Sequence, residues 1–174
     1  VNGNQLEFIG DTANSKQFGC TTDNVDTTLR MQALNDSSIN TITAISGTYI
    51  IEGLNLTRSI SGVGLPEFKL PPSASQNILE IEGSGINISG IKFNGDGTNN
   101  QTQNGPIMAN VTSSPDLTIS QCEITNFYER MVMLDTLSPF IKIYDNRIYD
   151  TDFTAQGSLR GDVFVIKASG AVIQ

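Results

Sequence analysis

The chain has 174 residues, enough for one domain with a substantial core, and its formal net charge is −8. This acidity argues against nucleic acids and anionic membranes as partners, because both require a basic face. The sequence contains no histidine, which excludes Ser-His-Asp and Cys-His catalysis and His-ligated zinc, and its two cysteines cannot form a structural zinc site alone. No apolar run approaches the length of a bilayer span, so we expect no membrane insertion.

One helix is predicted, over residues 23–36 (DNVDTTLRMQALND). Three residues can cap its first turn by accepting a hydrogen bond from a free backbone amide: Asp23, Asn24 and Asp26. Apolar side chains at i, i+4 and i+8 predict a buried stripe of Val25, Leu29 and Ala33. We expect residues 1–38 to be a lead-in whose helix covers one end of a β-rich body formed by residues 39–174.

From residue 39 onward, short segments alternate apolar and polar residues between turns of Gly, Asn, Asp and Pro, which predicts half-buried strands. Two segments, LTISQCEITNF (117–127) and FIKIYDNRIYDT (140–151), carry the same pattern 24 residues apart. The matched pairs are Leu117 with Ile141, Ile119 with Ile143, Cys122 with Asn146, and Ile124 with Ile148. Such a repeat predicts two successive coils of one structure.

Longer spacings extend the repeat in both directions. Ile86 and Ile88 precede Leu117 and Ile119 by 31 residues, Leu54 and Leu56 precede Ile86 and Ile88 by 32, and Val172 follows Ile141 by 31. A period of this size, with about three strands in each repeat, is typical of a solenoid. The sequence therefore predicts an all-β fold, a parallel β-helix of about five coils with one short N-terminal capping helix.

In a β-helix, equivalent residues of successive coils lie about 4.8 Å apart and stack on one another. We expect Cys122 to face inward under Asn146 at a tight turn, as a buried thiol and not as a nucleophile. The unequal repeat lengths place extra residues in 95–105 and 151–161. Because these insertions follow corresponding strands, they should project from one edge of the solenoid, where a site would be built.

Four segments together resemble a known family. They are TTDNVDTTLRMQAL (21–34), GTYII (47–51), ISGVG (60–64) and INISGIKFNGDG (86–97). Their order and spacing resemble the right-handed parallel β-helices of the pectate-lyase-like superfamily, including phage tailspike depolymerases, and the resemblance covers residues 18–174. Members of this family usually have ten or more coils, so the resemblance implies either that the β-helix continues beyond Gln174 or that a partner subunit covers its end. The His-containing cluster of the polygalacturonases is absent.

The resemblance implies action on acidic or neutral polysaccharides. Hydrolysis needs one protonated and one ionised carboxylate, whereas a lyase needs a base and a cation or Ca²⁺. Four charged residues open strands of successive coils and should share an edge: Glu129, Arg130, Arg160 and Asp162. We predict Glu129 and Asp162 as catalytic and Arg130 and Arg160 as substrate-binding; the alternative is that all four are solvated turn residues. Tyr144 should face outward as a platform for a sugar ring, or else be a partly packed strand residue.

Three functions remain open at this stage. The first is a phage tailspike or tail-fibre component, a homotrimer on the virion surface that binds a host surface glycan, with cleavage as a further activity. The second is a secreted bacterial polysaccharide lyase or glycoside hydrolase. The third is a structural or adhesive solenoid without catalysis, which the absence of histidine favours. We expect an extracellular or virion-surface location and no cofactor or metal, apart from Ca²⁺ if the chain is a lyase.

Overall fold

The structure is a computed structural model that describes residues 12–17, 19–20, 26–100, 108–111, 116–127, 132–134, 141–150, 164–166 and 172–173. The described chain is predominantly β, with one helix, α1 (Thr28–Asn35). Sheet A consists of β1 (Thr12–Asn14), β2 (Thr41–Ile45), β5 (Ser59–Val63), β8 (Asn87–Ser89), β11 (Thr118–Ser120), β14 (Lys142–Tyr144) and β17 (Val172–Ile173). Sheet B consists of β3 (Thr48–Ile50), β6 (Glu67–Lys69), β9 (Lys92–Asn94), β12 (Glu123–Thr125) and β15 (Arg147–Tyr149). Sheet C consists of β4 (Leu54–Leu56), β7 (Leu79–Ile81), β10 (Ala109–Val111), β13 (Val132–Leu134) and β16 (Phe164–Ile166).

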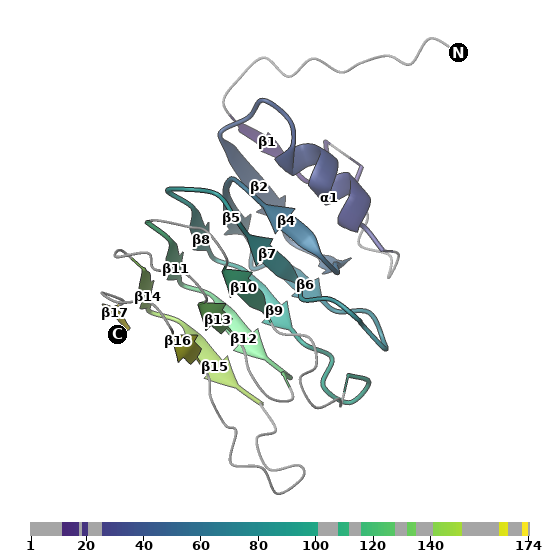
Figure 1. Cartoon of the computed structure of the whole chain (residues 1–174). Coiled ribbons are helices and arrows are strands. Elements are labelled where there is room, and N and C mark those ends of the chain that lie inside the picture. Colours follow the sequence, from purple (N-terminus) through teal and green to yellow (C-terminus); the bar gives the residue numbers. More distant parts are fainter. Residues whose placement is uncertain are drawn as a thin grey trace, which may run out of the picture.

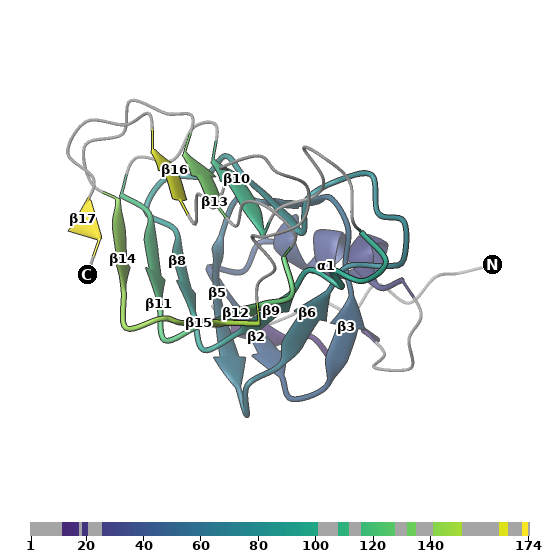
Figure 2. The same cartoon turned by 90° about the horizontal axis from the view of Figure 1, so that it is seen from below.

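From β2 onward, the chain visits sheets A, B and C in turn, so each strand pairs with the strand three places along the sequence. All strand pairs within the three sheets are parallel. Figure 1 shows the strands of each sheet stacked one beneath the other, and Figure 2 shows the three sheets arranged around a common interior. This arrangement is compatible with the predicted solenoid, in which each circuit of the chain adds one strand to every sheet.

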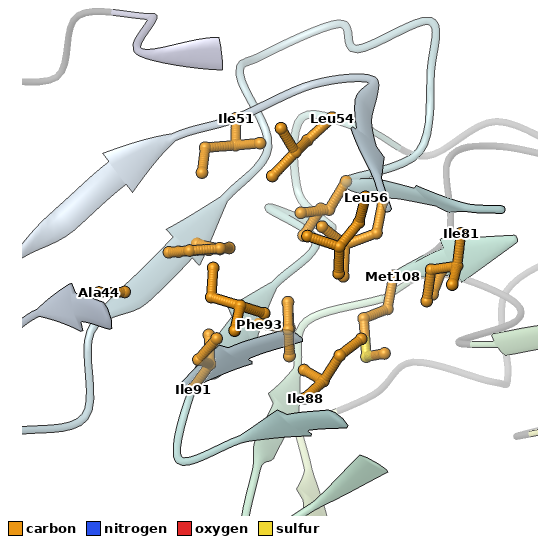
Figure 3. Packing of buried hydrophobic residues seen from close by; sticks show 14 of the residues in the cluster. Ala44, Ile51, Leu54, Leu56, Ile81, Ile88, Ile91, Phe93 and Met108 are labelled. Carbon is orange, nitrogen blue, oxygen red and sulfur yellow. The ribbon is translucent and has the colours of Figure 1, made fainter. Parts of the chain in front are cut away.

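The core is built from inward residues that alternate with outward ones along each strand. In sheets A and B an inward residue lies between two outward neighbours, whereas β4, β7 and β10 of sheet C turn their first and third residues inward. In sheet A this row is Ile42, Ile60, Ile88, Ile119 and Ile143, all buried. In sheet B it begins with three aromatic rings, since Phe68 contacts both Tyr49 and Phe93 edge-on at centroid distances of 5.9 and 5.8 Å. Figure 3 shows residues of this core from all three sheets meeting in the interior.

The predicted repeat of residues 117–148 is confirmed. Ile119 pairs with Ile143 in sheet A, and Ile124 pairs with Ile148 in sheet B. At the turn between them Cys122 is buried, with 1% of its surface exposed, and it is a free thiol. Its backbone N–H donates to Asn146 Oδ1 at 2.9 Å, while Asn146 Nδ2 donates to the Ile119 carbonyl at 3.0 Å. Burial raises the pKa of Cys122 to about 11, which suits a packing role and not a nucleophile.

The predicted equivalence of Leu54 and Leu56 with the strand INISGIKF is wrong. Leu54 pairs with Leu79 in sheet C, whereas Ile88 pairs with Ile60 in sheet A. The circuits near the N-terminus are shorter, because paired residues of β2 and β5 are 18 apart and those of β11 and β14 are 24 apart. A spacing of 32 therefore matched strands that belong to different sheets.

The predicted match of Val172 with Ile141 is wrong by one residue. Val172 pairs with Lys142, and Ile173 pairs with Ile143. A shift of one residue matters because it exchanges the two faces of a strand. The predicted offset of 31 between Ile88 and Ile119 is confirmed by their pairing in sheet A.

The helix α1 is shorter than predicted and buries a different side. Leu29 is 84% exposed and Ala33 is also exposed, while Met31 and Leu34 are buried. Among the predicted caps, Asp26 Oδ1 accepts a hydrogen bond from the Thr28 backbone N–H at 2.9 Å, and the other two and Val25 lie outside the described residues. In the described part of the chain, no helix is long and apolar enough to cross a bilayer.

The buried side of α1 is set by its contact with the edge of sheet C. Gln32 bonds both backbone groups of Asn55 at 2.9 and 3.1 Å, and Asn35 accepts from the Thr57 N–H at 3.0 Å and donates to the Asn55 carbonyl at 3.0 Å. Two side-chain amides therefore occupy the edge of β4 in place of another strand. Figure 1 shows α1 beside β4 at the N-terminal end of the stack.

Candidate functional site

The outer face of sheet B carries an ordered stripe of polar side chains. Its strands place their first residues in one register row and their third residues in a second, parallel row. We call eight of these residues the sheet B stripe: Glu67, Lys69, Lys92, Asn94, Glu123, Thr125, Arg147 and Tyr149. Along the first row the charge alternates, which is favourable because opposite charges lie directly across neighbouring strands.

Glu67 is the centre of the upper half of the stripe. Its carboxylate is 2.9 Å from Lys92 Nζ and accepts hydrogen bonds at 2.9 Å each from Thr48 Oγ1 and Asn94 Nδ2. Burial by itself would raise the pKa of Glu67, but the bonds from Asn94, Lys92 and Thr48 outweigh it and hold the pKa below its ordinary value. The same contact with Glu67 raises the pKa of Lys92, so both groups are charged at neutral pH.

Glu123, Arg147 and Tyr149 form the lower half of the stripe. Tyr149 Oη donates to Glu123 Oε2 at 2.7 Å, and this bond raises the pKa of the phenol. Arg147 lies 3.7 Å from the other carboxylate oxygen of Glu123, and its guanidinium carbon lies 4.7 Å from the centroid of the Tyr149 ring. The Arg147 side chain is 73% exposed, so most of its N–H donors face solvent. These donors and the Tyr149 ring can meet a ligand from solution.

Loops that lead from sheet B to sheet C border the stripe. Lys69 is joined to Asp96 by an ion pair of 3.2 Å, which fixes the loop after β9 against the stripe. Asn100, only 5% exposed, then links this loop to the one after β6: its Nδ2 donates to the Pro71 carbonyl at 3.1 Å, and its Oδ1 accepts from the Ala74 N–H at 2.8 Å. Hydrogen bonds therefore join the loops after β6 and β9 into one continuous wall along the border of the stripe.

The same wall is anchored to the preceding coil. Glu52 Oε1 accepts hydrogen bonds from the backbone N–H groups of Ser75 and Gln76 at 2.5 and 2.8 Å, and from Ser75 Oγ at 3.0 Å. The predicted insertion 95–105 follows β9 and the insertion 151–161 follows β15, both strands of sheet B, as expected for insertions at one edge. Residues 101–105 and 151–161 lie outside the described residues, so their projection stays a prediction.

The residues predicted as a site from the sequence are not those of the stripe. Glu129, Arg130, Arg160 and Asp162 lie outside the described residues, and their roles stay predictions. Tyr144 is half-buried on β14 of sheet A, in register with Ser120, and its role as a sugar platform is untested. The structure places it on a different sheet from Tyr149.

The stripe could have been found from one sequence signal. From β6 onward, each inward residue of sheet B is flanked by polar, charged or aromatic residues, in the segments EFK, KFN, EIT and RIY. EIT and RIY directly follow the turn position occupied by Cys122 and Asn146, and KFN follows Gly90 after one further residue, Ile91. Reading Glu123 as an isolated surface charge hides this pattern, because its partners Arg147 and Tyr149 are one coil away.

Chemically, the stripe offers hydrogen-bond donors, acceptors and an aromatic ring along a line. Its two carboxylates, Glu67 and Glu123, are two strands apart, which corresponds to roughly 10 Å between their backbone positions, measured across the strands. Lys92 lies between them and is paired with Glu67. Within the described residues, no group of three or more His, Cys, Asp or Glu side chains could hold a metal ion.

Comparisons with known proteins add no relative. No family model matches the chain, and no curated protein and no solved structure matches it either.

Proposed function

We propose that the chain forms part of a right-handed parallel β-helix of the pectate-lyase-like type and that it binds an extracellular polysaccharide along the sheet B stripe. The observation that carries this proposal is the stripe itself, because seven polar, charged or aromatic side chains that are at least partly exposed follow one face through four strands in register, with the buried Thr125 as the eighth. A polysaccharide is an extended polymer of hydroxyl groups, which donate to carboxylates and accept from ammonium and guanidinium groups.

The end of the stripe at Arg147 and Tyr149 supports the proposal most directly. A sugar ring has an apolar face that stacks on an aromatic side chain, and the phenol of Tyr149 is already held by Glu123 at 2.7 Å. The guanidinium of Arg147 is exposed and lies over the same ring. Because the hydrogen bond to Glu123 already orders the Tyr149 side chain, its ring loses little conformational entropy when a glycan binds.

The biological setting that we propose is a phage tailspike or tail fibre, assembled as a homotrimer on the virion surface and recognising a host surface glycan. The support is the resemblance of the lead-in helix, GTYII and ISGVG segments, together with three all-parallel sheets. If the protein also cleaves its glycan, we propose Glu129 and Asp162 as the catalytic carboxylates, with Arg130 and Arg160 binding substrate.

An adhesive solenoid without catalysis is the second candidate, and one observation favours it over a hydrolase acting at the stripe. Hydrolysis requires a carboxyl group that is protonated at the working pH, whereas Glu67 is ion-paired to Lys92 and its pKa lies below the ordinary value. Glu67 is therefore suited to binding and not to proton donation. A secreted lyase or hydrolase with its active site elsewhere stays an alternative.

A glycan-binding assay tests the site. We expect the double variant Arg147→Ala, Tyr149→Ala to bind a recognised surface glycan at least about tenfold more weakly than the parent chain. Lys142→Ala, which removes an exposed cation from sheet A, is the matched control and should bind normally. Binding that is lost with Tyr144→Ala but kept by the double variant would move the site to sheet A. Absence of binding to any glycan in a panel of bacterial capsules would contradict the proposal.

A turnover assay on the glycan that binds separates the three functional classes. New unsaturated sugars, followed by their absorbance, indicate a lyase, and new reducing ends without that absorbance indicate a hydrolase. Glu129→Gln with Asp162→Asn should abolish either activity while keeping glycan affinity. If both activities are absent and affinity persists, the chain is an adhesive solenoid.

A further inference from the structure

The pair Asn94–Gly95 lies at the centre of the stripe and carries a chemical liability. In an Asn-Gly pair, the glycine backbone nitrogen can attack the side-chain carbon of the asparagine, because no Cβ shields it. A bond forms between this nitrogen and Cγ, and ammonia leaves. Water then opens the resulting succinimide to give aspartate or isoaspartate, and the latter carries an extra methylene in the backbone.

We propose that Asn94 is a deamidation site that the folded sheet B keeps closed and that local opening of the end of β9 exposes. The first support is the position of the nucleophile. The Gly95 N–H donates to the Thr125 carbonyl at 3.0 Å, as part of the bonding between neighbouring coils. Attack requires this nitrogen to leave that bond and lose its proton, so the reaction must wait for β9 and β12 to separate here.

The second support is the set of hydrogen bonds that fix the Asn94 side chain, whose Cγ is the atom attacked. Asn94 Nδ2 donates to Glu67 Oε1 at 2.9 Å, and Asn94 Oδ1 accepts from the Asp96 N–H at 2.9 Å and from Asn126 Nδ2 at 3.3 Å. These bonds reach both neighbouring coils and fix the side-chain amide in one orientation. Turning its carbon toward the Gly95 nitrogen would break them.

The liability persists because both residues are required where they lie. A Cβ at Gly95 would lie 2.6 Å from the Asn126 backbone oxygen, closer than any side chain tolerates. At position 94, an aspartate would lose the amide donor and bring a second negative charge against Glu67, a repulsion that the stripe does not otherwise contain. Isoaspartate would also displace Asp96, which is paired with Lys69. Deamidation would therefore disrupt the stripe and its bordering loop together.

Peptide mass mapping over time at neutral pH tests the proposal, with the chain either folded or unfolded in urea. We expect conversion at Asn94 to be at least about tenfold slower in the folded chain. The Asn104–Gly105 pair in the same unfolded sample is the chemical reference and should convert at a rate similar to that of Asn94. Equal rates at Asn94 in the folded and unfolded chains would overturn the proposal.

Two variants distinguish a hold on Asn94 from general stability. Glu67→Ala removes the acceptor of the Asn94 amide and should accelerate conversion in the folded chain. Glu123→Ala breaks bonds on the same face without touching Asn94, and should leave the rate unchanged when both variants are compared at equal distance from their unfolding midpoints. Equal acceleration by the two variants would show that Asn94 follows overall stability, and would overturn a specific role for its hydrogen bonds.

Discussion

The outer faces of sheets A and B differ sharply, although the same coils build both sheets. On β2, β5, β8 and β11 the outward residues of sheet A carry no charge. Most are small and polar, namely Thr41, Thr43, Ser59, Ser61, Asn87, Ser89, Thr118 and Ser120, and the ends of β2 and β5 add the apolar Ile45 and Val63. The corresponding face of sheet B alternates acids and bases. Stacking constrains the inward residues of both sheets to be apolar, but it leaves the outward residues free. The charged face is therefore the one whose composition packing alone does not explain.

The interiors of the two sheets also differ, and this difference gives the largest expected effect. Phe68 lies between two other rings in sheet B, whereas sheet A is lined by isoleucine. We expect Phe68→Ala to lower the free energy of unfolding by about 3–5 kcal/mol and Ile88→Val to lower it by about 0.5–1.5 kcal/mol. Urea unfolding measures both. A loss below about 1 kcal/mol for Phe68→Ala would mean that the aromatic column is not tightly packed.

The turn that joins sheet A to sheet B gives the next effect. Asn146→Ala removes the acceptor of the Cys122 N–H and the donor to the Ile119 carbonyl. Because the buried Cys122 N–H loses its acceptor, we expect a loss of about 1–3 kcal/mol in urea unfolding. Asn87→Ala, at an exposed position of sheet A, is the control and should be nearly neutral. Similar losses for the two variants would argue against a special role for the corner amide.

The stripe should make stability depend on acidity. Since the pKa of Glu67 is lower in the folded chain than in the unfolded chain, its contribution is present above the unfolded value of about 4.3 and is lost as the pH falls through the folded pKa. Thermal unfolding measured over this pH range should show that the parent chain becomes less stable as the pH falls. The Glu67→Gln variant should lose less stability over the same range. Identical pH dependence of the two chains would contradict the contribution of Glu67.

The smallest effects compare two outward residues of one coil. Glu123→Ala removes the bonds to Tyr149 and Arg147 and should lower the free energy of unfolding by about 0.5–1 kcal/mol. Thr118→Ala on sheet A should change it by no more than about 0.5 kcal/mol. Added salt should reduce the Glu123 effect and leave the Thr118 effect unchanged. A Thr118 effect equal to that of Glu123 would remove the distinction between the two faces.

Much of the fold was predictable because stacking repeats local patterns. The turns that contain Cys122 and Asn146, between sheets A and B, have equal length, so the sequence offset of 24 is also the structural register of the strands on both sides. Where the length of a circuit changes, as around Leu54, sequence spacing alone cannot tell which sheet a strand joins. The buried side of the helix was predicted wrongly for another reason. It is set by hydrogen bonds from the side-chain amides of Gln32 and Asn35 to the β4 edge, and this tertiary contact overrides the apolar periodicity of the sequence.

The stripe was harder to predict than the fold. Its members are ordinary charged residues in the sequence, and only the parallel register brings Lys92 to Glu67, 25 positions away, and Arg147 to Glu123, 24 positions away. Of the residues predicted as a site, only Tyr144 lies among the described residues. It belongs to sheet A, whereas the charged stripe lies on sheet B.

The side-chain amides of α1 also make the two ends of the strand stack different, because they occupy the backbone groups at one end. At the Asn55 and Thr57 end of sheet C, backbone donors and acceptors are already taken by Gln32 and Asn35, so this edge offers no template to another chain. Association by strand addition is thereby closed at this corner. Two side chains of one short helix thus protect the protein from end-to-end polymerisation there, by using the same hydrogen bonds that a fibril would need.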